Sequence, residues 1–577
     1  MPAGFEPGQR RLNGPQTTGR AYRNLSPAVH GMTVDEDVRI PMRDGVKLLA
    51  DVHRPAEPGR YPVLVAASPY PRQIQNLGAP MGFIEAGASD WFVPRGYVHL
   101  IVNLRGTGGS GGEFGFFDAQ ERRDMHDVVE WAAAQDWSDG NVGMVGISYF
   151  AMTQVEAAVE RPPHLKAIMP VACTFDLYQS ATHNGLTNAG FLTPFLAMIG
   201  MTSARSDRFW RCALFDVLSD VLHLPGLHKR FATMNGEAAL AGVREVLKLH
   251  HPAKPWDELW NAAVVEHPFR DVWWQERNLV PLLERIEVPV YLGCDWQNVP
   301  LHLPETFKAL ERLAGRPNVR VAMMGEHGLA WPWESLHIEA LAWFDQWLKG
   351  RDTGIMDGPP IRYALPGAEG WRTAEIWPPA GTQMRALRLR GDGVLALDGD
   401  DAGARVMQTL GAGLGRAHPS EIDPPAVLQW DSAALGADMD VVGDIELQLE
   451  ATITAPDTAW IAVLQDVGPD GKATNITAGY LRAGLRAVDE TASRLGAPAL
   501  PCDRFEAVPV GERISYRIPL VPNARRFAAG HRLRLVLTSD DQDEAMPAML
   551  GFRHASIGTS CRSVIHATSR LLLPVAG

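Results

Sequence analysis

The chain has 577 residues, of which 46% are hydrophobic and 21% charged, a composition typical of globular domains rather than of a disordered chain. Because one hydrophobic core rarely serves so long a chain, we expect two to four domains. Acidic residues outnumber basic ones, 67 against 54, and the net charge of −13 argues against nucleic acid as a partner. No apolar stretch is long enough to cross a bilayer, so we expect no membrane partner either.

Residues 1–31 contain four arginines but no apolar run of the kind that forms a signal-peptide core, which predicts a flexible arm on a cytoplasmic protein. The five cysteines lie far apart without a CxxC pair, so neither a disulfide framework nor structural zinc is expected. The sequence contains no HExxH motif and no clustered His/Asp pattern, and we expect no metal and no cofactor. A homo-oligomer is left open.

Residues 32–174 alternate short apolar runs with helical segments, which is typical of βαβ units and a mostly parallel sheet. Strands are predicted over 61–67, 96–103 and 141–146. Residues 119–135 place apolar side chains at helical spacing and are predicted to form an amphipathic crossover helix. This pattern indicates a doubly wound α/β layout.

Residues 175–279 change to helical stretches rich in Trp, His and Phe, which predicts a helical cap inserted into the α/β domain. The α/β pattern then returns in residues 280–355, with strands and helices predicted over 288–293, 303–313, 319–324 and 335–348. Residues 356–577 show short alternating strands separated by Gly, Pro and Asp, for example 445–453 and 532–538, and predict an all-β domain.

Ser148 lies in the run VGISY (residues 145–149), directly after a predicted strand and before the apolar helical run 151–159. This context is typical of a nucleophile elbow, in which a strained strand-to-helix turn lifts the hydroxyl above the sheet and next to a helix N-terminus. Phe150 replaces the second glycine of the usual G-x-S-x-G motif. A serine at a helix N-cap can also be purely structural. Its flanks favour Ser148 as the nucleophile.

A serine nucleophile needs a base, and in this layout the acid precedes the histidine along the chain. His327 is the best candidate because it lies in MGEHG (residues 324–328), at the end of a predicted strand and before a helix. An inconsequential loop position suits His30, His418 and His554 better, and His337 is predicted to pack inside its helix.

With these residues in place, the chain resembles the cocaine esterase and α-amino-acid ester hydrolase group, relatives of the X-prolyl dipeptidyl peptidases. The resemblance runs from about Glu36 to Leu571 and is carried by the motifs PMRDGVKL (41–48), SPY (68–70), LRGTGGS (104–110), WSDGNVGM (137–144) and GISY (146–149). It implies an α/β-hydrolase domain with an inserted helical cap, followed by a C-terminal all-β jelly-roll domain over residues 356–577. These parts correspond to the three regions distinguished above.

The resemblance also implies roles for single residues. Ser148 corresponds to the acylated serine and His327 to the general base. Tyr70 corresponds to a tyrosine whose hydroxyl joins the oxyanion hole, with the backbone N–H of Tyr149 as the second donor. Without the resemblance, Tyr70 would be interpreted as an aromatic residue in a turn.

The acid position departs from the family, which has Gly-Trp-x-Asp after an apolar strand. This chain has PVYLGCDWQN (289–298), and alignment on Trp296 places Asn298 at the acid's position, with Asp295 three residues earlier. Either Asp295 supplies the carboxylate, or Asn298 orients His327 through its amide oxygen. We favour Asp295, because a buried imidazolium strongly favours a nearby carboxylate.

The leading hypothesis is a serine esterase or amidase that cleaves a small acyl or aminoacyl substrate, or a short peptide, through an acyl-enzyme, with cap tryptophans forming an apolar acyl pocket. The alternatives are an acyltransferase that uses the same acyl-enzyme and, motivated by Asn298, a degenerate non-catalytic member. The glycine-rich run 105–112 lacks the Lys-Ser/Thr pair of a phosphate loop, and we expect a turn near the active site.

Overall fold

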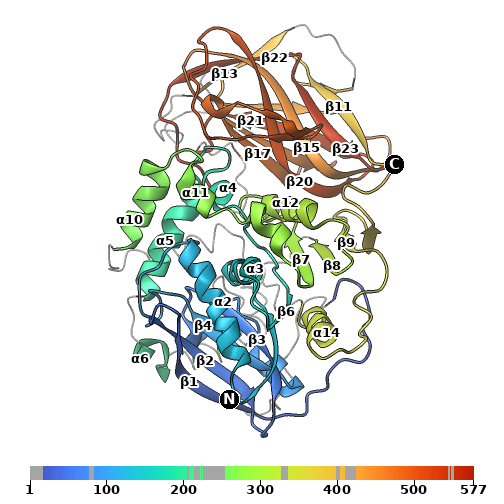
Figure 1. Ribbon diagram of the computed structural model, residues 1–577. Helices are drawn as coiled ribbons and strands as arrows, with labels where there is room; N and C mark the ends of the chain where they lie inside the picture. Colours follow the sequence, from blue (N-terminus) through green and yellow to red (C-terminus); the bar gives the residue numbers. More distant parts are fainter. Residues whose placement is uncertain are drawn as a thin grey trace.

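The computed structural model describes residues 17–76, 84–203, 207–213, 254–325, 336–397, 403–409, 424–542 and 552–577, together with residues 217, 221, 224 and 546. Figure 1 shows an α/β part, coloured from blue to olive, beneath a β-rich part in orange and red. Within the described residues, no helix combines the length and the apolar character needed to cross a membrane.

The α/β part is built on a ten-stranded sheet with the strand order β1-β2-β4-β3-β5-β6-β7-β8-β9-β10. Pairing is parallel from β4 through β9, while β1, β2 and β10 pair antiparallel with their neighbours. The strands are β1 (Met32–Pro41), β2 (Lys47–Pro55), β3 (Tyr61–Ser68), β4 (Val98–Asn103), β5 (Ser138–Met144), β6 (Leu165–Ile168), β7 (Val290–Asp295), β8 (Val319–Met324), β9 (Ile361–Ala364) and β10 (Trp371–Ala374).

Helices cover this sheet and connect its strands (Figure 1). They are α1 (Ser89–Phe92), α2 (Ala119–Ala133), α3 (Tyr149–Glu160), α4 (Leu177–Thr182), α5 (Ala189–Ser203), α6 (Asp207–Trp210), α10 (Trp256–Asn261), α11 (Val272–Glu276), α12 (Leu303–Leu313) and α14 (His337–Leu348). The predicted helix 303–313 and strand 319–324 have the observed bounds. His337 is 1% exposed and packs against Trp91, with ring centroids 5.6 Å apart.

Helix α2 illustrates why these segments fold as they do. The side chain of Asp118 caps its first turn by accepting a hydrogen bond from Glu121 N at 2.8 Å. The apolar stripe predicted from the sequence is the face that packs on α3, β5 and β3, and its side chains are buried. All six residues of β4 are buried, as expected for a strand in the interior of a sheet covered by helices.

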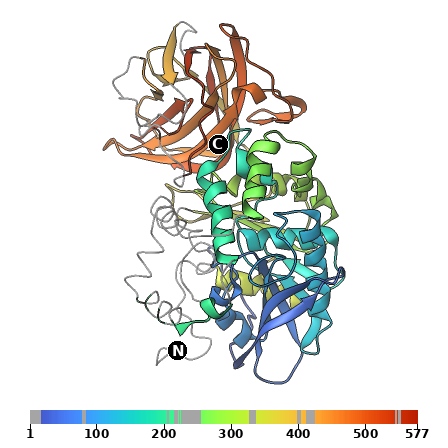
Figure 2. The same ribbon diagram turned by 90° about the vertical axis from the view of Figure 1, so that its left-hand side faces the viewer.

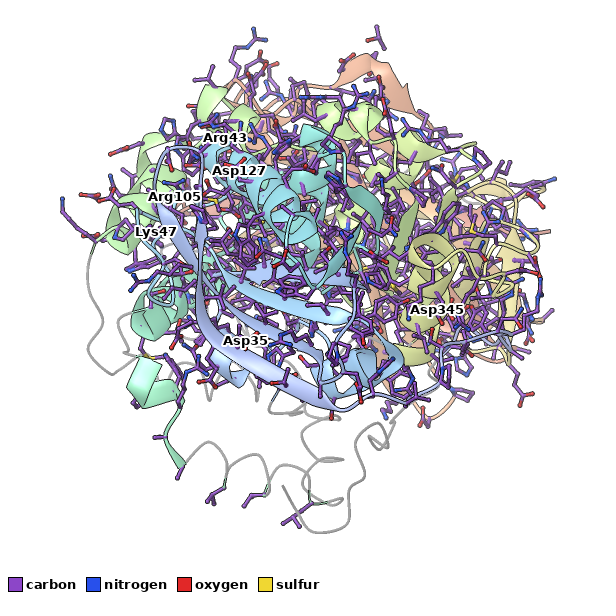
Figure 3. All side chains as sticks on the ribbon, turned by 60° about the horizontal axis from the view of Figure 1, so that its bottom comes forward. Asp35, Arg43, Lys47, Arg105, Asp127 and Asp345 are labelled. Carbon is purple, nitrogen blue, oxygen red and sulfur yellow. The ribbon has the colours of Figure 1, made fainter. Side chains whose placement is uncertain are left out.

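Residues 17–31 differ from the flexible arm predicted for the N-terminus. Thr18 Oγ1 donates to Glu339 Oε1 (3.1 Å), and Ser26 donates through both its N–H (2.6 Å) and its hydroxyl (2.7 Å) to the carboxylate of Asp345 on α14, labelled in Figure 3. The segment therefore packs against α14 through buried hydrogen bonds, which an apolar-periodicity argument does not detect.

The β-rich part contains an eleven-stranded sheet with the path β12-β11-β23-β15-β20-β17-β16-β21-β14, joined by β13 and β22. Figure 2 shows it packed directly on the α/β part. Its strands are β11 (Gln383–Leu389), β12 (Leu395–Ala396), β13 (Ala404–Thr409), β14 (Val427–Asp431), β15 (Met439–Ile453), β16 (Ala459–Val467), β17 (Ala473–Arg482), β20 (Arg513–Phe527), β21 (Arg532–Thr538), β22 (Cys561–His566) and β23 (Arg570–Val575); β18 (Asp489–Arg494) and β19 (Ala497–Ala499) form a separate pair.

The division predicted at residue 355 falls inside the α/β sheet. Strands β9 and β10 follow that position, yet β9 pairs in parallel with β8, so the first sheet continues to Ala374. The short alternating pattern of β9 and β10 resembles that of the strands in the β domain, and only the pairing of β9 with β8 assigns them to the first sheet.

Candidate active site

Ser148 occupies a sharp turn between β5 and α3. It stands at the N-cap of α3 with φ 57° and ψ −120°, a backbone conformation that non-glycine residues rarely adopt. The turn leaves no room for a side chain at Gly146, where φ is 129° and an added Cβ would lie 2.2 Å from Cβ of Phe150. Phe150 itself fits at the position of the missing second glycine and is fully buried. The turn has the strained geometry expected of a nucleophile elbow.

Three groups lie around the Ser148 hydroxyl. The Nε2 atom of His302 is 3.2 Å from Ser148 Oγ. The hydroxyl of Tyr70 hydrogen-bonds to Ser148 and lies in a buried setting that raises its pKa well above the usual value, so the phenol stays protonated. Tyr149 is the first residue of α3, where backbone N–H groups have no partner within the helix. The hydroxyl of Tyr70 and the N–H of Tyr149 thus lie at the same turn as Ser148, and their roles as oxyanion donors stay predictions.

The backbone of Tyr70 is fixed on both sides. Its N–H donates to Ser68 Oγ (3.1 Å), and its carbonyl accepts from Asn103 Nδ2 (2.6 Å). Asn103 ends β4, and the neighbouring Gly108 must lack a side chain, since an added Cβ would lie 2.2 Å from Asn103 Oδ1. The glycine-rich run is therefore a turn that makes room for the residue holding Tyr70.

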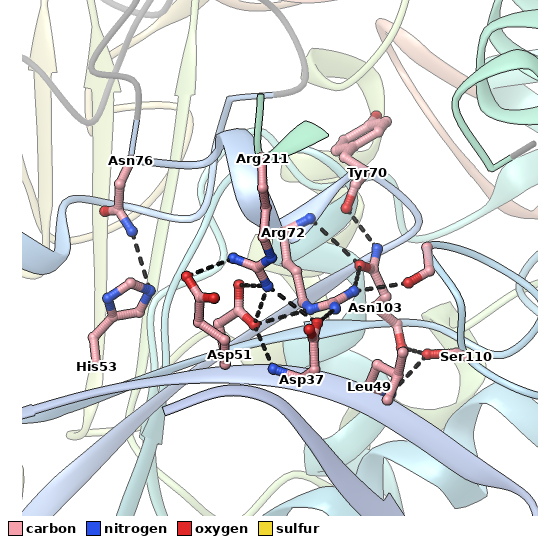
Figure 4. Close-up of polar contacts among 12 residues, drawn as sticks. Asp37, Leu49, Asp51, His53, Tyr70, Arg72, Asn76, Asn103, Ser110 and Arg211 are labelled. Atoms are coloured by element: carbon pink, nitrogen blue, oxygen red, sulfur yellow. Dashed lines mark hydrogen bonds and ion pairs between the residues drawn. The ribbon is translucent and has the colours of Figure 1, made fainter. Parts of the chain in front are cut away.

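A buried arginine supports this turn from below (Figure 4). Arg72 is 1% exposed and donates to Asp51 Oδ1 (3.1 Å), Asn103 Oδ1 (3.1 Å) and the carbonyl of Gly108 (2.7 Å). At the outer end of the same run, Arg105 pairs with Asp124 of α2 at 2.6 Å, near the Arg43–Asp127 pair seen in Figure 3. Buried charges satisfied in this way rigidify a site.

The turn between β7 and α12 carries two further candidates, Asp295 and Asn298, and leads to His302. Asp295 ends β7, is 3% exposed, and accepts from Gln297 N at 2.6 Å. Asn298 accepts from the backbone N–H of His302 through Oδ1 at 3.1 Å. The side chains of Asp295 and Asn298 both cap this turn, and Asn298 thereby fixes the backbone of His302.

The β domain holds this turn from the other side. Asn523 of β20 donates to the carbonyl of Trp296 (3.0 Å). His183, at the end of α4, has its Nε2 atom 2.6 Å from the carbonyl of Pro300 and its Nδ1 atom 2.7 Å from His554, which in turn lies 2.7 Å from Asp541. The position of the β7–α12 turn thus depends on side chains distant in the sequence.

The sequence-derived base, His327, lies outside the described residues. Asp295 is paired across the sheet with Met324, three residues before His327 in the chain. The roles predicted for His327, Asp295 and Asn298 as base and acid stay predictions.

A small cavity opens beside Ser148. It has a volume of about 30 Å³ and is lined by aromatic and aliphatic side chains that include five hydroxyls and one imidazole: Tyr70, Phe116, Phe117, Ser148, Tyr149, Met152, Thr174, Leu177, Ser180, Phe191, Phe195 and His302. No tryptophan is among the described residues that line this cavity, and the expectation that cap tryptophans form the acyl pocket stays a prediction. Trp256 and Trp274 are buried in packing, and Phe191 and Phe195 of α5 supply the aromatic wall.

Sequence reasoning missed His302 and its neighbour Thr174. His302 directly precedes α12 in the turn after a parallel strand, which is the location that singled out His327. Applying the same criterion to every histidine after a predicted strand would have found it, because side chains at the carboxyl ends of parallel strands converge.

Comparison with known proteins agrees with this architecture. Residues 44–334 match the X-Pro dipeptidyl-peptidase (S15 family), and residues 353–549 match the X-Pro dipeptidyl-peptidase C-terminal non-catalytic domain. The chain is 28% identical over 559 residues to the cocaine esterase of Rhodococcus sp. (strain MB1 Bresler), covering 88% of this chain and 91% of that protein.

Two solved structures show the same fold. A CocE/NonD family hydrolase from Staphylococcus aureus has a TM-score of 0.73 at 22% identity, covering 95% of this chain and 94% of that one. An α-amino-acid ester hydrolase has a TM-score of 0.70 at 17% identity, covering 97% and 99%. The predicted fold class, an α/β-hydrolase with a C-terminal β domain, is confirmed.

Proposed function

Because the chain belongs to the X-Pro dipeptidyl-peptidase (S15) family of serine hydrolases and is a hydrolytic enzyme, we propose that it cleaves esters of small acyl groups through an acyl-enzyme on Ser148. The observation that carries the proposal is the elbow itself. The strained Ser148 turn aims its hydroxyl at a basic nitrogen and a buried phenol beside an apolar cavity. An N-cap serine with a structural role needs none of these neighbours.

The oxyanion of the tetrahedral intermediate would be bound by the hydroxyl of Tyr70 and the N–H of Tyr149. Such donors act on charge that develops only in the transition state, and they act strongly where water is excluded. Tyr70 is suited to this role because burial keeps its phenol protonated and Asn103 fixes its backbone.

The cavity supports a neutral acyl group. Among its described lining residues none carries a carboxylate that could bind a free α-amino group, and its aromatic walls favour an apolar acyl chain. The cavity volume of about 30 Å³ suits a short chain better than a long one. Ester substrates are the class named for the cocaine esterase that this chain is similar to.

The test is a labelling and turnover experiment. A fluorophosphonate probe should react with Ser148 in the wild-type enzyme, and Ser148→Ala should abolish both labelling and hydrolysis of p-nitrophenyl acetate. In a panel of p-nitrophenyl esters, acetate and propionate should give a higher kcat/KM than octanoate, and aminoacyl amides a lower one. Turnover that survives Ser148→Ala would disprove the proposal.

The same panel separates hydrolysis from acyl transfer. With an added alcohol or amine, a hydrolase releases the free acid as its main product. A product dominated by the new ester or amide would identify an acyltransferase using the same acyl-enzyme.

A further inference from the structure

We propose that His302 is the general base that takes the proton of Ser148, an inference that rests on the acyl-enzyme function above. Its Nε2 atom is the ring nitrogen 3.2 Å from Ser148 Oγ, within hydrogen-bond distance of the atom that must lose its proton. The two residues are separated by 154 positions in the chain and meet because β5 and β7 end at the same edge of the sheet.

The hydrogen bonds behind the ring decide which nitrogen of His302 carries the proton. Thr174 Oγ1 lies 2.9 Å from His302 Nδ1 and 3.0 Å from Ser180 Oγ, and Ser180 Oγ donates to the carbonyl of Leu301 at 2.8 Å. Each hydroxyl has one proton to give. Since Ser180 gives its proton to Leu301, it can only accept from Thr174.

The number of hydroxyl protons also fixes the direction of the hydrogen bond between Thr174 and His302. Thr174 has given its proton to Ser180, so it can only accept from His302, whose neutral ring must therefore carry its proton on Nδ1. This leaves the lone pair of Nε2 facing the Ser148 hydroxyl. The relay through Thr174 and Ser180 thus holds His302 in the tautomer that a base for Ser148 requires.

The burial of His302 is consistent with this state. Burial lowers the pKa of its imidazole to about 3, so the ring is neutral at neutral pH and presents its Nε2 lone pair, although it is a weaker base than an ordinary histidine. Thr174 takes the orienting place that a carboxylate holds in a Ser-His-Asp triad. A hydroxyl orients the ring but does not balance the charge of the imidazolium, so the enzyme should be slower than one with a full triad.

The departure of the sequence from its family occurs in the same turn. The position that carries the acid in the resembling family is Asn298, and its side chain caps the backbone of His302 four residues later. The turn that has lost a carboxylate at position 298 has an imidazole that reaches the nucleophile directly. The structure therefore assigns a catalytic role to this turn through a different residue.

The proposed reaction consists of an acylation and a deacylation. The Ser148 hydroxyl proton moves to His302 Nε2 while Oγ bonds to the substrate's carbonyl carbon, and the carbonyl π electrons become the oxyanion held by Tyr70 and Tyr149 N–H. The oxyanion collapses, the bond to the leaving group breaks, and the leaving group takes the proton from Nε2. A water molecule then attacks the acyl-Ser148 ester, gives one proton to Nε2, and the alcohol of Ser148 recovers that proton as the acid departs.

The decisive variant is His302→Gln. A glutamine amide can still accept from Ser148 and donate to Thr174, but it takes up no proton. We expect kcat/KM for p-nitrophenyl acetate to fall by about 10²–10⁴-fold, with the far-UV spectrum and thermal midpoint close to those of the wild type. A His302→Gln enzyme within tenfold of the wild type would overturn the proposal, and a loss confined to His327→Gln would assign the base to the sequence-derived candidate.

Controls separate chemistry from structure. His337→Gln makes the same change at a buried histidine packed on Trp91, away from Ser148, and should leave kcat/KM unchanged. If Ser148→Ala is inactive while His302→Gln is active, only the base assignment fails. If Ser148→Ala is active, the proposed function fails first.

The positioning relay has its own test. Thr174→Val keeps the shape but removes the acceptor of His302 Nδ1–H, and we expect kcat to fall about tenfold with little change in KM. Thr174→Ser should restore kcat, because it returns the hydroxyl. Equal activity of the valine and serine variants would overturn the tautomer argument.

Discussion

Two turns of the α/β domain approach the same point from opposite sides, and they are specified differently. The β5–α3 turn, which carries Ser148, is set by its own residues, because Gly146, Ser148 and Phe150 must fit together within five positions. The β7–α12 turn, which carries His302, is held by Asn523 from the β domain and by His183 at the end of α4. A nucleophile elbow can be recognised from a short motif, whereas the other turn is defined by contacts that no motif contains.

Apart from the nucleophile and the base, the largest expected effect concerns Tyr70, the donor next to the first turn. Tyr70→Phe should lower kcat by about 10²–10³-fold while KM changes little, because an oxyanion donor acts on the transition state. Steady-state kinetics on p-nitrophenyl acetate measure both constants. An unchanged kcat would remove Tyr70 from the oxyanion hole.

Gly146→Ala tests how locally the elbow is specified. The added methyl would lie 2.2 Å from Cβ of Phe150 at a φ of 129°, so Ser148 should shift. We expect roughly 1–3 kcal/mol of lost stability and a fall of about 10²-fold in the labelling rate of Ser148. Gly315→Ala is the matched control, since its φ is also positive but no atom lies within 4 Å of the added Cβ.

Asn298→Ala tests the second turn from within. The change removes the acceptor for His302 N–H, and we expect kcat to fall about tenfold. Asn298→Asp keeps an acceptor oxygen and should behave like the wild type. A large increase of kcat in Asn298→Asp would instead indicate that a carboxylate at this position serves His327. Asp295→Asn tests the other candidate acid, and a fall of kcat by several orders of magnitude would identify Asp295 as a triad acid.

Asn523→Ala tests how strongly the β domain fixes the β7–α12 turn. This side chain donates to Trp296 O and to Ile476 O, and its loss should cost about 1–3 kcal/mol of stability because two buried carbonyls lose a donor. Urea unfolding measures the cost. We expect kcat and the labelling rate of Ser148 to fall together and only a few-fold, because the Ser148 turn is specified by its own residues.

The smallest expected effect is in the pH profile. Since burial lowers the pKa of His302 to about 3, the base form persists as pH falls, and kcat/KM should stay nearly level from pH 8 to pH 5. A histidine base paired with a carboxylate has a raised pKa and becomes protonated at a higher pH, so an enzyme with such a base would lose activity over this range. The hydroxyls of Ser148 and Thr174 contact the ring, the hydroxyl of Tyr70 lines the same cavity, and all three are protonated in this range.

Glu305 needs a control in that experiment. It lies three residues after His302, and burial raises its pKa to about 7, so its titration falls within the range measured. Glu305→Gln removes this contribution. A profile that falls below pH 7 in both the wild type and Glu305→Gln would contradict His302 as the base.

The sequence by itself determined the elements whose specification is local. The strand-to-helix context of Ser148 follows from a glycine that permits the turn and from the apolar runs on either side. The Ser-Pro-Tyr turn, the parallel strands and the amphipathic helices follow from short-range periodicity and from motifs shared with the family. These features gave the fold class and the candidates for the nucleophile and the two oxyanion donors.

Only the tertiary structure decided which side chain meets the Ser148 hydroxyl. His302, Thr174 and Ser180 come from three segments, and their alignment depends on where β6 and β7 end and on how α4 packs above them. The same holds for Arg72 beneath Tyr70 and for the N-terminal segment on α14, whose hydrogen bonds span 21 to 321 positions of the chain. Hydrogen bonds between distant segments leave no periodic pattern in the sequence, because a buried polar group can find its donor or acceptor at any position along the chain.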